Sequence, residues 1–189
     1  MLKLTDQFRA ARRVSVPLIA ITTSDPAACV ESLRAATNGA PLLRWDIAQG
    51  VVPLNEPEGK DALLKMIGES APESVKNPAA MLQAALKLPP QSILFFSNAQ
   101  RFLTSEAAGT MVMQAIWNLR DHFKANRRTL VMLCPDIQLP LELQGDVLVL
   151  DEPLPTRDEL GEIVKGNYKA AGLKEPEDGA LAKAVDALA

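Results

Sequence analysis

The chain has 189 residues, of which 48% are apolar and 23% are charged. A chain of this size and composition folds as one domain, or as one domain with a small appendage, and its core needs no disulfide or metal. Intrinsic disorder is excluded on the same grounds. Its 20 basic and 23 acidic residues leave a net charge of −3, whereas proteins that bind polyanions without specificity are usually basic.

Cysteines, histidines and apolar runs exclude further classes of protein. Cys29 and Cys134 are the only cysteines and His122 is the only histidine, which excludes zinc ribbons, disulfide frameworks and multi-histidine metal sites. The same cysteine usage favours the reducing cytoplasm. The longest clean apolar run, residues 16–21, is far shorter than the roughly 20 residues that span a bilayer. We therefore expect no targeting or membrane segment.

The first part of the chain alternates predicted helices and strands. Leu4, Phe8 and Ala11 recur at helical spacing, and the pair Asp25-Pro26 is typical of a helix start. The elements expected are a helix over residues 2–13, a strand over 14–22, a helix over 27–36 that ends at Asn38-Gly39, a strand over 41–47 followed by a turn at Gly50, and helices over 60–68 and 79–87, the latter opened by Asn77-Pro78.

The second part of the chain continues this alternation and then becomes helical. The elements expected are strands over 92–97, 129–134 and 147–150, a long helix that Thr104 or Ser105 caps and that runs to about Ala125, a rigid link at Pro153 and Pro155, a helix over 157–169 with Thr156 as its cap and Glu159 in its first turn, and a short helix from about Glu177. Strands that alternate with helices indicate a parallel sheet with helices on both faces, a three-layer α/β fold.

Such a fold calls for a search for a phosphate loop. That loop needs glycines, so that backbone N–H groups can wrap the anion, a Lys for the β- and γ-phosphates, and a Ser or Thr for magnesium. The turn over residues 22–27, Thr-Thr-Ser-Asp-Pro-Ala, contains neither Gly nor Lys. Asp25 adds negative charge where a phosphate would lie, and Pro26 removes one N–H donor. The turn therefore predicts a capped helix start.

Two other positions lack the residues that an ATPase would use. Ser97-Asn98 ends the strand over 92–97, where acids that hold magnesium and activate water would be expected, and neither residue is a general base near neutral pH. Cys134-Pro135-Asp136 ends the strand over 129–134, where an active ATPase would carry a polar sensor residue such as Asn. The sequence thus predicts no catalytic, cofactor-binding or metal-binding residue, and no enzyme activity for this chain.

Some single residues have structural interpretations. His122 lies about 120° from the middle of the apolar stripe of its helix, and we expect it to be at least partly exposed. Cys29 and Cys134 are interpreted as small core residues, because no motif places a His beside either. Trp45 and Trp117 are interpreted as packing residues.

A cluster of basic residues has two interpretations. Arg120, Lys124, Arg127 and Arg128 fall on adjacent turns at the end of the long helix. Cations at a helix C-terminus complement the helix dipole, and this is the simpler interpretation. An anion or nucleic-acid contact is the other, joined by a second group consisting of Arg9, Arg12 and Arg13.

Several stretches in this order resemble one protein family. They are residues 44–50, Asn77-Pro78, and residues 93–103, 128–133, 139–143 and 147–160. Together they are similar to the N-terminal half of a group of AAA+ ATPases from cyanobacteria, plastids, other bacteria and phages, in which a degenerate ATPase-like domain precedes an active AAA+ module. The resemblance covers roughly residues 12–170, and residues 139–160 carry it most strongly.

The resemblance implies a P-loop-NTPase-like (AAA+) core over residues 1–155 and the start of a helical lid, itself truncated, over 156–189. With the alternating pattern it predicts a parallel five-stranded sheet. The strand over 16–22 would be central, flanked by those over 129–134 and 147–150. The strand over 92–97 would lie beyond 129–134, and the strand over 41–47 would form the far edge.

The sequence departs from the family pattern in its chemistry. Ser97-Asn98-Ala99-Gln100 replaces the common acidic pattern, and no Arg occurs between Asp136 and Asp146, where an arginine finger is often found. The last residues look like an interrupted helix, which favours a piece of a longer protein over a free-standing relic.

Three functions remain open from the sequence. The first is a non-catalytic assembly or adaptor domain, with the C-terminal AAA+ module, neighbouring subunits and a protein client as partners and without cofactor or membrane. The second is a nucleic-acid or anion-binding module that uses the basic helix end around Arg120 and Arg128. The third is a nucleotide-binding domain with an unorthodox loop, against which the missing Gly and Lys count. Salt dependence separates the first two, because backbone binding weakens steeply with added salt.

Overall fold

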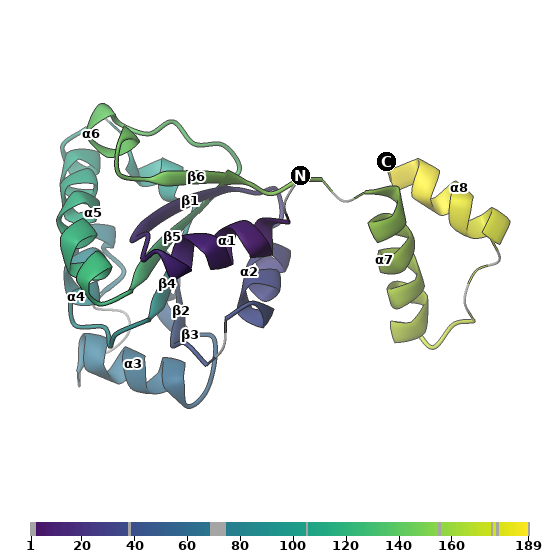
Figure 1. Cartoon of the computed structure of the whole chain (residues 1–189), viewed down its shortest axis with the longest axis horizontal. Helices are drawn as coiled ribbons and strands as arrows, with labels where there is room; N and C mark the ends of the chain where they lie inside the picture. Colours follow the sequence, from purple (N-terminus) through teal and green to yellow (C-terminus); the bar gives the residue numbers. More distant parts are fainter. Residues whose placement is uncertain are drawn as a thin grey trace. The chain divides into compact units, whose positions relative to one another are not determined.

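The computed structural model describes residues 3–37, 39–68, 75–104, 106–154, 156–174, 176 and 178–188. The chain divides into two units, Met1–Glu152 and Pro153–Ala189. Figure 1 shows the first as a sheet with helices around it and the second as a pair of helices. Of the residues used above to place element boundaries, Leu2, Asn38, Ser105, Pro155 and Glu177 lie outside the described part of the chain.

The first unit is built on one sheet whose strand order is β3-β2-β4-β5-β1-β6. Its strands are β1 (Leu18–Thr22), β2 (Leu42–Asp46), β3 (Gly50–Pro53), β4 (Ile93–Ser97), β5 (Thr129–Cys134) and β6 (Leu148–Asp151). β1 pairs in parallel with β5 on one side and with β6 on the other, and β4 lies in parallel between β2 and β5. The predicted order of the five parallel strands is therefore confirmed, with β1 flanked as expected.

The prediction of five strands was wrong by one edge strand. β3 pairs antiparallel with the strand predicted over 41–47, which is therefore not the edge of the sheet. The Asp46 carboxylate accepts hydrogen bonds from the N–H groups of Ala48 and Gln49, both at 2.9 Å, and Gly50 has a φ of 76°. These features make a tight hairpin. A four-residue strand that begins with Gly and ends with Pro has the composition of a turn, which hid it.

Alternate residues of each strand face opposite helical layers, as the period of a strand requires. Ile19 and Ile21 of β1 belong to the hydrophobic cluster formed with α1 (Leu4–Arg13) and α2 (Pro26–Ala35). Leu18 and Ala20 belong to the larger cluster on the other face. The elements on that face are α3 (Glu58–Ile67), α4 (Pro78–Ala85), the short 3₁₀ helix η2 (Ala99–Phe102), α5 (Ala107–Ala125) and α6 (Leu141–Gln144). The three-layer α/β prediction is confirmed (Figure 1).

Most helix boundaries follow the capping residues that the sequence presents. Asp25 and Asn77 cap helices that begin at a proline, where the missing N–H is no loss. The cap expected for the long helix was wrong: its N-cap is Glu106, which makes no side-chain capping hydrogen bond. Without such a bond, the sequence offered no signal for the first residue of α5.

The two tryptophans differ in burial. Trp45 is fully buried, its indole Nε1 donates to the carbonyl of Val75 at 2.7 Å, and its ring meets Phe96 edge-on with centroids 5.0 Å apart. The packing role predicted for it is confirmed. Trp117 is 40% exposed, so it is less buried than Trp45. The guanidinium of Arg120 lies over its ring, 4.9 Å from the ring centroid, and its packing role stays a prediction.

One arginine of α1 joins three parts of the first unit. The Arg12 guanidinium donates to the carbonyls of Gln91, at 2.8 Å, and Arg127, at 3.1 Å, and to the hydroxyl of Thr129, at 3.0 Å. These residues precede or begin β4 and β5. Burial lowers the pKa of Arg12. A charged donor shared among three loop and strand acceptors fixes α1 against the amino ends of two central strands.

The second unit consists of α7 (Arg157–Ala170) and α8 (Asp178–Leu188), which contact each other. Thr156 caps α7 as the sequence predicted, and with Glu159 it forms a capping box in which each side chain bonds the other residue's backbone N–H. Leu160, Val164 and Val185 are buried in this unit. In the described part of the chain, no helix is both long and apolar enough to cross a membrane.

Replacing Arg12 tests the three-way contact. We expect Arg12→Ala to lower the free energy of unfolding by about 2 kcal/mol, because it removes a charged donor shared by three acceptors, of which the one on Thr129 belongs to a buried residue. Arg12→Lys should recover only part of this, since an ammonium lacks the planar fork. The control is Arg13→Ala, an exposed neighbour, which should change the stability by less than about 0.5 kcal/mol. Urea unfolding followed by circular dichroism measures all three; equal losses for Arg12→Ala and Arg13→Ala would contradict the assignment.

Candidate functional site

The turn between β1 and α2 is the natural place for a ligand in this fold. It follows the carboxyl end of β1, which lies between β5 and β6 in the sheet. In parallel α/β sheets, ligands bind beyond the carboxyl ends of the strands, and helix N-terminal N–H groups hold their phosphates. The contacts of residues 22–28 therefore determine what this site can hold.

The first N–H groups of α2 are already bonded to a side chain. The Asp25 carboxylate oxygen Oδ1 accepts from the N–H of Ala27 at 3.1 Å and of Ala28 at 3.0 Å. Pro26 has no N–H to offer. The donors that a phosphate would use thus face a carboxylate of the chain itself, and the capped helix start predicted from the sequence is confirmed.

Thr23, two residues before this cap, connects the turn to two other strands. Thr23 is buried, with 3% of its surface exposed, and its N–H donates to the carbonyl of Cys134, at the end of β5, at 2.8 Å. Its hydroxyl accepts from the N–H of Asp25 at 3.0 Å and donates to the carboxylate of Glu152. The N–H of Glu152 in turn donates to the carbonyl of Thr22 at 2.9 Å.

Glu152 is the member of this site that sequence reasoning missed. It directly follows β6, which pairs with β1, so the pairing of the last strand brings it to the turn. The sequence did offer one signal. The strand over 147–150 was expected beside the central strand, so a residue that follows it could have been expected near the turn. With Asp25 and Glu152, the turn carries two carboxylates, and the hydrogen bonds of its described residues join it to no lysine or arginine side chain.

The two thiols near this edge of the sheet are neutral. Burial raises the pKa of Cys29 to about 12, and the negative charges of Glu152 and Asp25 add to the effect. Burial also raises the pKa of Cys134, although contacts with the backbone of Gln100 and Ala99 partly oppose it. Both cysteines are fully buried and free, in agreement with the core role predicted for them. A neutral thiol is a poor nucleophile and a poor metal ligand.

The ends of β4 and β5 lie on the same side of the sheet as the turn. Ser97 ends β4, and Asn98, which follows, has a φ of 54°. Neither is an acid that could hold magnesium. Asp136, two residues after β5, is exposed. Within the described ranges, no group of three or more His, Cys, Asp or Glu residues could bind a metal ion.

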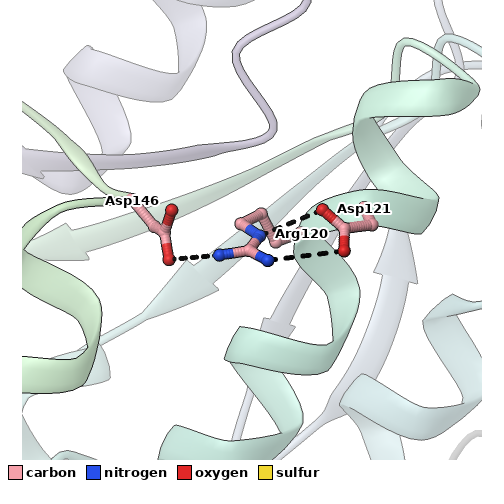
Figure 2. Close-up of polar contacts among 3 residues, drawn as sticks. All are labelled: Arg120, Asp121 and Asp146. Carbon is pink, nitrogen blue, oxygen red and sulfur yellow. Dashed lines mark hydrogen bonds and ion pairs between the residues drawn. The ribbon is translucent and has the colours of Figure 1, made fainter.

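The basic cluster predicted at the end of α5 is divided by local contacts. Figure 2 shows the Arg120 guanidinium between two carboxylates, those of Asp146 at 2.8 Å and Asp121 at 3.0 Å. The hydrogen bonds with these carboxylates raise the pKa of Arg120, and the bond from Arg120 lowers the pKa of Asp121. The charge of Arg120 is therefore neutralised within the chain.

A second member of the cluster is turned inward. Arg128 is 8% exposed and donates to the carbonyl of Leu86 at 3.0 Å, and burial lowers its pKa. Lys124 and Arg127 remain exposed, as does His122, as expected. Arg12, which was to join them, bonds backbone carbonyls instead. The four cations therefore do not form one surface for an anion.

A groove of about 420 Å³ lies between α4 and α5, away from the turn. None of its lining residues is charged; they are Ala79, Leu82, Gln83, Leu86, Thr110, Met111, Gln114, Ala115, Asn118 and Leu119. It offers apolar contact and neutral polar groups, and nothing that would bind a nucleotide phosphate.

The strand order, the layers and the position of the turn define the P-loop-NTPase-like fold of AAA+ proteins. The chain belongs to the family of SpoVK-like AAA ATPase N-terminal domains, whose model matches residues 4–152. That match spans the sheet and ends where the first unit ends.

Solved AAA+ structures share the fold at low sequence identity. A DNA replication initiation factor matches with a TM-score of 0.59 and 12% identity, over 96% of this chain and 54% of that one. AMPPCP-bound DnaA from Aquifex aeolicus matches with a TM-score of 0.54 and 12% identity, over 98% and 58%. The HORMA:CdnC:Trip13 complex of E. coli MS115-1 also matches, with a TM-score of 0.54 and 11% identity, over 95% and 62%. The chain thus spans about half to three fifths of these structures. No curated protein sequence shows a significant match.

The raised pKa of Cys29 predicts how stability changes in alkali. The unfolded thiol loses its proton near pH 8.5–9, whereas the folded thiol keeps it until about pH 12. Stability contributed by the neutral thiol is therefore complete below pH 8.5 and falls as the pH rises toward 12, by at most about 1.4 kcal/mol per pH unit. Urea unfolding between pH 8 and 11 should show a shallower decline in Cys29→Ala than in the unmodified chain. Parallel declines would mean that Cys29 titrates normally in the folded state.

Proposed function

We propose that this chain is a non-catalytic N-terminal domain of a longer AAA+ ATPase and acts in assembly or as an adaptor. Its family membership supports the N-terminal position. The observation that carries the non-catalytic role is the bonding of the Asp25 carboxylate to the first N–H groups of α2. In this proposal the turn serves the fold and holds no nucleotide.

Electrostatics supports the loss of ATP binding. A phosphate at the turn would have to displace Asp25 from the helix N-terminus and would then lie near both Asp25 and Glu152. No lysine stands in residues 22–27 to balance these charges, and no glycine frees the backbone to wrap an anion. The end of β4, Ser97-Asn98, offers no acid for magnesium.

The retained core supports a role through contacts. The sheet is buried on both faces over β1, β4 and β5, so the fold is kept although the residues of ATP chemistry are absent from the turn. A domain of this kind can brace a ring or hold a client without lysine, magnesium or an acid. The partners proposed are the C-terminal AAA+ module, neighbouring subunits and a protein client.

The finer features of the proposal follow from the sequence resemblance. The longer protein would belong to the AAA+ group of cyanobacteria, plastids, other bacteria and phages, would oligomerise through its active module, and would act in the cytoplasm. The helices α7 and α8 would be the start of the helical lid. We do not propose a nucleic-acid-binding role, because Arg120 and Arg128 are engaged within the chain.

Titration calorimetry with Mg·ATP tests the loss of nucleotide binding. We expect no binding with a dissociation constant at or below about 10 μM, a free energy of roughly −7 kcal/mol, because two carboxylates occupy the place of a phosphate. Mg·ADP serves as a second ligand with one phosphate fewer. Binding of either nucleotide in that range would show that the turn still holds phosphate.

Deletion of residues 1–155 from the longer protein tests the assembly role. We expect basal ATP hydrolysis to remain largely intact and oligomerisation or client engagement to be impaired, because this domain would supply contacts and no catalytic group. Size-exclusion chromatography with light scattering and a phosphate-release assay measure the two properties. Loss of hydrolysis in a ring that stays assembled would mean that the domain contributes to the active site.

A further inference from the structure

Glu152 is the last residue by which the first unit holds the chain before it continues to α7. Its N–H donates to the carbonyl of Thr22 at 2.9 Å, which extends the pairing of β6 with β1 by one residue. This is the last backbone hydrogen bond that joins β1 to the described residues after β6. Pro153 and Leu154 are exposed, Leu154 by 82%. Beyond Glu152, the described residues of the link therefore have no burial to hold them.

We propose that the hydroxyl of Thr23 and the carboxylate of Glu152 form a latch, the Thr23–Glu152 latch, that fixes the point at which the chain leaves the first unit. The turn that other P-loop folds give to a phosphate here holds a carboxylate of the chain itself. This inference goes beyond the proposed function and does not depend on it, because it concerns the closing of β6 onto the turn whether or not a nucleotide binds.

The chemistry of the latch is that of a charge-assisted hydrogen bond. The hydroxyl of Thr23 donates to a carboxylate of Glu152 while its oxygen accepts from the N–H of Asp25 at 3.0 Å. Each bond polarises the hydroxyl in the sense that strengthens the other. Thr23 is 3% exposed, so water competes poorly for its hydroxyl, and bonds of this kind are stronger than those between neutral groups.

The side-chain contact between Thr23 and Glu152 matters because β6 by itself is a short and exposed strand. β6 has only four residues, of which only Leu150 is buried, and Leu148 and Val149 are 37% and 44% exposed. Among the described strands it pairs only with β1. A short, exposed edge strand opens easily by local unfolding. A hydrogen bond from the buried Thr23 to the residue directly after β6 holds the carboxyl end of that strand, beyond which no described residue makes a backbone hydrogen bond to β1.

Amide hydrogen exchange on the 189-residue chain tests the latch. The reporter is the protection factor of the Glu152 amide, and the reference is the Leu130 amide, which donates to the carbonyl of Pro17 at 2.8 Å in the centre of the sheet. We expect Thr23→Val to lower the Glu152 protection factor about tenfold, and Glu152→Gln to lower it several-fold, with Leu130 unchanged. Thr23→Ser, which keeps the hydroxyl, should remain within about twofold of the unmodified chain.

Asp151→Asn is the matched control. Asp151 is the neighbouring acid in β6, it is exposed, and no described residue donates a hydrogen bond to its carboxylate. The same change of charge there should leave the Glu152 protection factor unaltered. If Thr23→Val and Glu152→Gln left that factor unchanged, or lowered it only together with that of Leu130, the latch would be overturned.

The outcome is separable from that of the proposed function. Titration of the same variants with Mg·ATP should still show no binding, since opening the latch supplies neither glycine nor lysine. Nucleotide binding by the unmodified chain would refute the non-catalytic proposal and leave the exchange result standing. If the Glu152 protection factor were unchanged in the variants and no nucleotide bound, the latch would be overturned and the non-catalytic proposal would stand.

Discussion

The turn after β1 is the constraint on which the rest of the first unit depends. Thr22, Thr23 and Asp25 bond to the end of β5, to the residue after β6 and to the first turn of α2. In a fold where this turn binds phosphate, the ligand and the glycines around it would make such connections. Here the carboxylates of Asp25 and Glu152 and the hydroxyl of Thr23 make them, and the N–H groups of Asp25, Ala27 and Ala28 are bonded to side chains of the turn itself.

The same turn sets the electrostatics of this edge of the sheet. Burial raises the pKa of the Cys29 thiol, and the negative charges of Glu152 and Asp25 add to this effect. The cations of α5 and α1 are elsewhere and are engaged, with Arg120 on two carboxylates and Arg12 on backbone carbonyls. Phosphate chemistry would need the opposite arrangement, with cations at the turn.

Sequence patterns predicted the fold well where burial or capping decides the structure. The runs of apolar residues identified every parallel strand, and Asp25-Pro26, Asn77-Pro78 and Thr156 with Glu159 marked helix starts correctly. The predictions failed where tertiary contacts decide. β3 exists because a hairpin at Gly50 returns it to β2, and Arg128 turns inward because the carbonyl of Leu86 lies within reach. The pairing of β3 with β2 and the contact of Arg128 with Leu86 cannot be seen in a local sequence pattern.

The candidate site shows the same division between local and distant information. The absence of glycine and lysine between Thr22 and Ala27 is local, and it predicted a capped helix correctly. Glu152 lies 129 residues from Thr23 in sequence, and only the pairing of β6 with β1 brings them together. The contacts among Thr23, Asp25 and Glu152 explain how a turn without glycine or lysine is held in place.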